Sequence, residues 1–152
     1  MCKENRTGYI SSFLYDEGIK PNWFDLESKI SYWLLGASWD GEDQVQRFIK
    51  NSIWENGYSP DSGDSSIEVA KKINSGDFIA LKSSFTKNND EGKRIPCIRI
   101  KAIGEVLSNA GDGVHLSVKW VSTDSFDVDG LSYRKTVGKV RSNDKEAIFD
   151  FE

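Results

Sequence analysis

The chain has 152 residues, of which 38% are hydrophobic, 12% aromatic and 29% charged, the size and composition of one globular domain. Its formal net charge of -4 argues against a protein that coats long stretches of nucleic acid by charge alone. No window approaches the roughly 18 apolar residues of a membrane span, and the first residues lack the apolar stretch of a signal peptide, so we expect a cytoplasmic protein.

The first segment differs in composition from the rest. Residues 1–30 mix polar residues with scattered aromatic ones, and we interpret them as an N-terminal extension with one or two short helices. The predicted domain covers residues 31–152. Cys2 and Cys97 lie far apart in the sequence and predict neither a disulfide framework nor a zinc site, and we expect no cofactor.

The domain is predicted to begin with a strand and a helix. The apolar run at 32–35 is closed by Gly36, a pattern typical of a buried strand. Beyond Asp40 the apolar residues recur with helical spacing, acidic residues suit a first helical turn, and Gly57 offers a stop. On this helix Trp54 would point roughly 165° away from the centre of the apolar stripe, off the core face.

A second, shorter helix and a strand are predicted next. Ser65 has capping-box spacing to Glu68, and the helix is expected to end before Gly76. Residues 77–84 then predict a strand that is apolar on both faces until its end. Residues 86–93 are polar and predict a loop.

The second half of the chain carries a hairpin signal. Alternating residues predict a strand at 95–107, bent at Gly104, and a turn at 111–113 joins it to a strand at 114–120. The remaining signals are weaker. They predict an acidic loop at residues 122–130 and two short strands, at 131–140 and 147–151.

These elements describe an α+β domain, with two helices between the first and second of five or six strands. So many short strands leave many edges exposed, and closure of the sheet is the simplest way to protect them. We therefore predict a small, mixed and partly closed β-barrel with intervening helices.

Signatures of catalysis are weak. His115, the single histidine, falls on the polar face of a predicted strand, which favours a solvated or structural role. Lys82–Ser83 is similar to the end of a phosphate loop, but the residues before it predict a strand. The acidic groups have neither histidines nor ligand spacing beside them. The sequence therefore predicts no catalytic or metal-binding set.

Cations concentrate between Leu81 and Lys101, in an otherwise acidic chain. The basic residues are Lys82, Lys87, Lys93, Arg94, Arg99 and Lys101, against the acidic Asp90 and Glu91. A basic stripe beside aromatic residues is typical of a nucleic-acid reader with few phosphate contacts. An ordinary solvated hairpin face is the alternative.

The domain is rich in tryptophan. Trp33 and Trp120 fall on apolar faces of predicted strands, which assigns them to the core. Trp39 follows small residues as the chain leaves its first strand, and Trp54 lies off its helix stripe. Both are candidates for ligand contact, and packing back onto the barrel is the alternative. Phe85 is a third candidate.

Three sequence elements, in this order, resemble a known family. They are Gly-Ala-Ser-Trp at 36–39, Ile-Trp-Glu-Asn-Gly-Tyr at 53–58 and Gly-Asp-x-Ile-Ala-x-Lys-Ser-Ser at 76–84. Over about residues 31–121 the chain resembles the EVE-like domains of the PUA-like superfamily. It is most similar to the N-terminal reader domain of McrB-type modification-dependent restriction ATPases. The fold of that family is a small β-barrel with intervening helices.

The resemblance implies a non-enzymatic DNA-binding module that takes a flipped, modified base, methylated above all, into an aromatic cage. Such a module would give a restriction or defence system its specificity, with modified DNA and an AAA+ ATPase or nuclease as partners. The resemblance assigns base binding to Ser38, Trp39, Asp40, Trp54, Asn56, Ser83, Ser84 and Phe85. It assigns contacts with flanking phosphates to Lys82, Lys87, Arg94 and Arg99.

Three alternatives stay open. An RNA reader would keep the same fold, an enzyme acting on modified nucleosides would use Lys82, Thr86 and Glu105, and a structural interaction domain would bury Trp39 and Trp54 away from any pocket. A cavity of roughly 300 Å³ between the two tryptophans would favour the reader. No ATPase motif is recognised, so both a piece of a larger ATPase and a free-standing reader are compatible with the sequence.

Overall fold

The computed structural model describes residues 30–149. The chain divides into two units, Met1–Ile30 and Ser31–Glu152, and the fold below is that of the second. The helices expected within residues 1–30 and the end of the strand expected at 147–151 lie outside the described residues.

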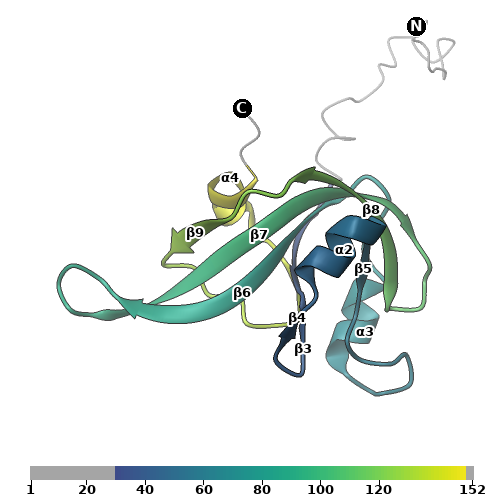
Figure 1. The fold of residues 1–152 in the computed structure, drawn as a ribbon, viewed down its shortest axis with the longest axis horizontal. Helices are drawn as coiled ribbons and strands as arrows, with labels where there is room; N and C mark the ends of the chain where they lie inside the picture. The colour runs from purple at the N-terminus through teal and green to yellow at the C-terminus, as the bar shows by residue number, and fades with distance from the viewer. Residues whose placement is uncertain (1–29, 150–152) are drawn as a thin grey trace, which may run out of the picture. The chain divides into compact units, whose positions relative to one another are not determined.

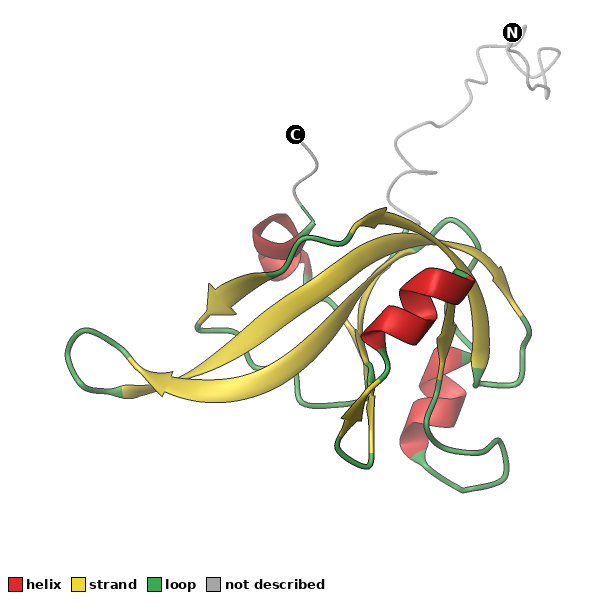
Figure 2. Cartoon of the chain, in the orientation of Figure 1, coloured by secondary structure: helices red, strands yellow, loops and turns green. Residues whose placement is uncertain are grey.

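Strands dominate the described part of the chain (Figure 2). Seven of them form one curled sheet in the order β10-β2-β6-β7-β8-β5, with β9 paired to β7 (Figure 1). β2 and β6 are parallel and the other neighbours are antiparallel, so the sheet is mixed. The strands are β2 (Tyr32–Gly36), β5 (Ile53–Glu55), β6 (Phe78–Asn88), β7 (Arg94–Asn109), β8 (His115–Ser122), β9 (Phe126–Asp129) and β10 (Val137–Lys139).

Shorter elements complete the described region. β3 (Ser38–Trp39) and β4 (Glu42–Asp43) pair as a separate two-stranded hairpin. The helices are α2 (Val45–Asn51), α3 (Ser65–Ala70) and, after a 3-10 turn at Ser142–Asp144, α4 (Lys145–Ile148).

Apolar side chains pack into two cores. One core includes Phe48 of α2, and the other includes Ile148 of α4. β6 contributes to both, since Ile79 and Leu81 belong to the first core and Ala80 to the second. A strand with apolar packing on both faces reads as a continuous apolar run, which explains the sequence pattern of this segment.

Several predictions for the fold are confirmed. The α+β class, the first strand, the second helix and the hairpin turning at 111–113 are all present. The register of β7 against β8 shifts at Gly104, where a bend was predicted. Asp64, rather than Ser65, caps the second helix, because its carboxylate accepts a hydrogen bond from the Ser66 N–H.

The first predicted helix is shorter than expected. Glu42–Asp43 forms β4 instead of a first helical turn, and the helix ends at Asn51 because Ser52 adopts a left-handed conformation with φ 58°. The chain then continues as β5, antiparallel to β8. Trp54 thereby turns inward and is fully buried. The prediction that Trp54 lies off the core was wrong because it extended the helix past Ser52.

Three other segments differ from prediction. The loop expected from Thr86 begins only after Asn88, because β6 continues. The acidic segment 122–130, predicted as a loop, contains β9, which pairs with β7. α4 occupies the beginning of the strand predicted at 147–151, since a short apolar run does not distinguish helix from strand.

Candidate functional site

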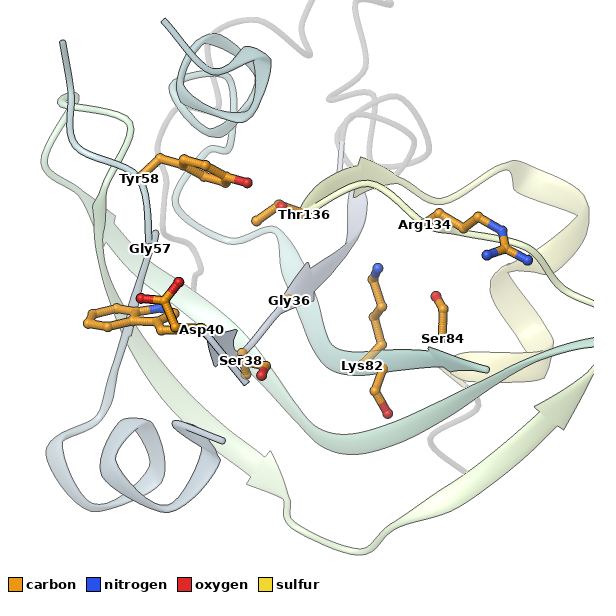
Figure 3. A pocket seen from close by; sticks show the side chains of 12 residues that line it. Gly36, Ser38, Asp40, Gly57, Tyr58, Lys82, Ser84, Arg134 and Thr136 are labelled. Atoms are coloured by element: carbon orange, nitrogen blue, oxygen red, sulfur yellow. The ribbon is translucent and has the colours of Figure 1, made fainter. Parts of the chain in front are cut away.

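A cavity of about 380 Å³ opens where the chain leaves β2 (Figure 3), within the usual range of ligand pockets, about 300–1,000 Å³. Four segments line it: the turn from β2 into β3, the chain after β5, the middle of β6 and the chain before β10. The lining residues are Gly36, Ala37, Ser38, Trp39, Asp40, Gly57, Tyr58, Lys82, Ser83, Ser84, Arg134 and Thr136.

Backbone geometry shapes this cavity. The Gly36 N–H donates to the Thr136 carbonyl at 2.8 Å, which ties the end of β2 to the chain before β10. Asp40, at φ 51°, then helps to reverse the chain into β4. Gly57 lies against Trp39 so closely that a Cβ there would be 2.8 Å from Trp39 Cδ1. A side chain at position 57 would displace the ring.

Two aromatic side chains, Trp39 and Tyr58, line the cavity. The Arg47 guanidinium lies 4.7 Å from the centroid of the Trp39 ring, and Phe48 meets that ring edge-on at 6.2 Å. Neither of these two supporting residues lines the cavity. Tyr58 is 46% exposed, and its N–H donates to Asn56 Oδ1. One supported ring and one exposed ring suit stacking against a planar ligand.

Lys82 and Ser84 of β6 supply a polar edge. Lys82 Nζ and Ser84 Oγ each donate a hydrogen bond to the Tyr133 carbonyl at 2.7 Å, and Figure 3 shows the two side chains next to each other. Lys82 is only 7% exposed, and burial lowers the pKa of its ammonium to about 8. Within residues 30–149 no carboxylate forms an ion pair with Lys82. The ammonium therefore brings uncompensated positive charge and spare donors to the cavity.

Six residues predicted to contact nucleic acid line this cavity together. The parallel pairing of β2 with β6 sets Gly36 opposite Lys82 and so joins two segments that are far apart in the sequence. Lys82, predicted to contact a phosphate, lines the same cavity as the predicted base-binding residues. The six are Ser38, Trp39, Asp40, Lys82, Ser83 and Ser84.

Three other predicted base-binding residues do not line the cavity. Trp54 is buried, and its indole N–H donates to the Gly36 carbonyl at 2.8 Å, so it supports the cavity from the core. The Asn56 amide is buried and donates to Ser66 Oγ and to the Gly113 carbonyl. Phe85 is not among the lining residues, and its ring lies 5.1 Å from the Arg99 guanidinium.

The remaining tryptophans of the described region belong to the core. Trp33 is buried, and its indole N–H donates to Asp77 Oδ2 at 3.0 Å. Trp120 is partly buried against the same core and donates to the Phe48 carbonyl. The assignment of Trp33 to the core from its apolar strand is confirmed, and Trp120, assigned from strand alternation, packs against that core from a partly buried position.

Three of the six cations in the predicted basic stripe, Lys87, Arg99 and Lys101, form ion pairs in the folded chain. Lys87 Nζ lies 2.9 Å from a carboxylate oxygen of Asp129, and Arg99 Nε lies 2.8 Å from one of Asp127. Arg99 also lies over the Phe85 ring, at 5.1 Å. Both acidic partners belong to β9, which was predicted as a loop. Of the four predicted phosphate contacts, Arg94 is the one that stays exposed without an ion pair among the described residues.

Sequence reasoning missed three polar side chains of the cavity, besides Gly36, Ala37 and Gly57. Tyr58 ends the Ile-Trp-Glu-Asn-Gly-Tyr element, but the phase of a presumed helix drew attention to Trp54 instead. Arg134 and Thr136 lie in a segment with only a weak strand signal. The sequence Tyr-Arg-Lys-Thr at 133–136 combines an aromatic residue with two basic ones, a composition that could have marked it as a binding segment. No pattern in the neighbouring sequence indicates that it lies near Lys82.

The residues imagined for an enzyme do not form one group. Lys82 pairs with Ile100, whereas Glu105 pairs with Phe78, four residues earlier on β6. Thr86 lies four residues beyond Lys82, about 13 Å along the strand. His115 Nδ1 forms a hydrogen bond with Asp112 Oδ2 at 2.7 Å, and His115 does not line this cavity. Among residues 30–149, no three or more His, Cys, Asp or Glu side chains lie together so that they could hold a metal ion.

Comparison of the chain with protein-family models, curated proteins and solved structures found no match. In the part of the chain that the structure describes, no helix is both long and apolar enough to cross a membrane.

Proposed function

We propose that this domain is a DNA-binding reader that holds a flipped, modified base, methylated above all, in the cavity beside Trp39 and Tyr58. The observation that carries the proposal is a ligand-sized cavity of about 380 Å³ with two aromatic rings and a hydrogen-bonding edge. In this proposal the curled sheet is a PUA-like, EVE-like barrel. The reader supplies specificity to a restriction or defence system, with an AAA+ ATPase or nuclease as a further partner.

The aromatic rings favour a base as the ligand. A flipped base loses its stacking and pairing, at a cost of a few kcal/mol. Stacking on a protein aromatic ring returns about 1–3 kcal/mol per base, so Trp39 and Tyr58 can offset much of this cost. Ala37 and Thr136 also line the cavity and add methyl groups. An added methyl group on the base gains about 0.8 kcal/mol when apolar surface of this kind buries it.

The polar residues suit the edge of a base, which presents both acceptors and donors. Lys82 and Ser84 carry donors, and the Asp40 carboxylate is an acceptor. Hydrogen bonds with a buried ammonium are stronger than those with exposed groups, because water competes less for them. An arrangement with both kinds of group can distinguish bases by their edges.

The test compares the binding of duplex DNA with and without a modified base to the wild type, Trp39→Ala and Tyr58→Ala. Each substitution removes one stacking surface, so we expect affinity for the modified duplex to fall roughly 5- to 150-fold. Fluorescence anisotropy with labelled duplexes gives these affinities, and circular dichroism checks that each variant is folded.

Phe85→Ala is the matched control, because it removes an aromatic ring from the same domain outside the cavity. Its affinity should stay near the wild-type value. Equal affinity for modified and unmodified duplexes, at both low and high salt, would remove the modified-base proposal. If unlabelled RNA displaces the labelled DNA at a lower concentration than unlabelled DNA does, RNA rather than DNA is the ligand.

A further inference from the structure

Positive charge is concentrated in β10 and in the chain on either side of it. Residues 131–143 contain four cations and neither Asp nor Glu, although the whole chain is acidic. All four are exposed. We call these four residues, Arg134, Lys135, Lys139 and Arg141, the basic face.

The basic face lines a second cavity, of about 440 Å³. All four cations contribute to its wall, and no carboxylate does. Among the described residues, the one ion pair of the basic face joins Arg141 Nε to Asp144 Oδ2 at 3.1 Å. Among the described residues, three cations, Arg134, Lys135 and Lys139, therefore face this cavity without a paired acidic side chain.

Backbone continuity places the basic face next to the first cavity. The Tyr133 carbonyl accepts the hydrogen bonds of Lys82 and Ser84, while the Tyr133 ring lies 4.5 Å from the Arg141 guanidinium. Arg134 follows Tyr133 and lines both cavities. A nucleotide strand that leaves the first cavity on this side would therefore pass Arg134.

We propose that the basic face binds the phosphates that flank the flipped nucleotide, an inference that rests on the proposed function. A nucleotide whose base enters the first cavity remains joined to its neighbours through phosphates, which must pass the rim of that cavity. Exposed Arg and Lys side chains without paired acids bind phosphates and release their condensed counter-ions. The phosphate role thus falls to Arg134 and its neighbours rather than to the paired Lys87 and Arg99.

The test measures affinity for duplex DNA, with and without a modified base, over a series of salt concentrations. Lys135→Gln combined with Lys139→Gln should reduce the slope of log K against log salt concentration by about 0.9 for each phosphate that the variant no longer neutralises. Both duplexes should lose affinity by the same factor. The matched control, Lys50→Gln combined with Lys119→Gln, removes the same charge from exposed positions outside both cavities and should keep the wild-type slope.

The outcomes separate the two proposals. A wild-type slope in the basic-face variant overturns this inference, and so does an equal reduction in the control, which would reflect net charge alone. A reduced slope without preference for the modified duplex supports the phosphate face and overturns base reading. If the basic-face variant still prefers the modified duplex and its salt slope is unchanged, base reading is supported and the phosphate face is overturned. Failure of the wild type to bind any duplex at low salt overturns both proposals.

Discussion

Lys82 brings a cation into the interior at the position where β6 shifts its register against β7. The Tyr133 carbonyl accepts one of its hydrogen bonds, and Figure 3 shows the ammonium beside Ser84, which donates to the same carbonyl. Burial disfavours the charged form, which is why the pKa falls from 10.5 to about 8. A ligand with a hydrogen-bond acceptor at this position would relieve part of that cost.

Replacement of Lys82 by methionine should stabilise the protein at pH 7. Below pH 8 the folded wild type holds a buried charge that Lys82→Met lacks. Between pH 8 and 10.5 the folded state releases this proton while the unfolded state keeps it, so the contribution of Lys82 to the free energy of unfolding rises with pH. The advantage of the variant should therefore shrink over this interval, as measured by urea denaturation of both proteins at each pH.

Lys119→Met is the control for this measurement, since Lys119 is exposed on β8. The change with pH should be larger for Lys82→Met than for this control. A Lys82→Met protein less stable than the wild type at pH 7 would contradict the argument, because it would show that the Tyr133 hydrogen bond outweighs the cost of burial.

At the scale of elements, the β7–β8 pairing depends on close packing at Gly104. The register shifts between Ile103 and Gly104, and the glycine lies under the side chains of Val118 and Trp120. A Cβ at this position would be 2.5 Å from Val118 Cγ1 and 3.0 Å from the Lys119 carbonyl. The absence of a side chain therefore allows β7 and β8 to pack around the first core.

Gly104→Ala should destabilise the domain by about 1–3 kcal/mol, the usual cost of overpacking. Gly138→Ala in β10 is the matched control, because its Cβ would meet Tyr133 Cδ2 at an ordinary 3.8 Å. That variant should differ from the wild type by less than about 0.5 kcal/mol. Thermal and urea denaturation measure both effects, and equal stability of the two variants would refute the packing argument.

At the scale of the whole domain, Trp54 connects two regions of the curled sheet that are far apart in the strand order. It lies on β5, the last strand of that order, and its indole donates to Gly36 at the end of β2. The curl brings these two strands close enough for one buried side chain to span the interior. Gly36 also lines the first cavity, so this contact supports the cavity wall.

Trp54→Ala should cost about 3–5 kcal/mol of stability through the cavity that it leaves. Trp54→Phe retains an aromatic ring but leaves the Gly36 carbonyl without this donor, which should cost about 1–3 kcal/mol. Urea denaturation gives both values. Trp39→Ala, at a partly exposed position, should cost less than Trp54→Ala, and the opposite order would contradict the assigned roles.

Part of the cavity lining could be named from the sequence. The family resemblance singled out Ser38, Trp39 and Asp40 after the first apolar strand and Lys82 to Ser84 in a second one, and these two segments line one cavity. Trp54 was misplaced because a single left-handed residue, Ser52, ended the helix. The charge of Arg99 was misjudged because its partner, Asp127, lies in a segment with no strand signal.

The α+β class, β2, α3 and the β7–β8 hairpin were determined by the sequence alone, because apolar spacing and turn residues act over a few positions. Only the tertiary structure decided which aromatic rings line a cavity and which cations lack an acidic partner among the described residues. Both depend on pairing between segments far apart in the chain: β5 with β8 buries Trp54, and β9 with β7 pairs Arg99 with Asp127. Such pairing reflects packing and register across the whole sheet, which no local pattern encodes.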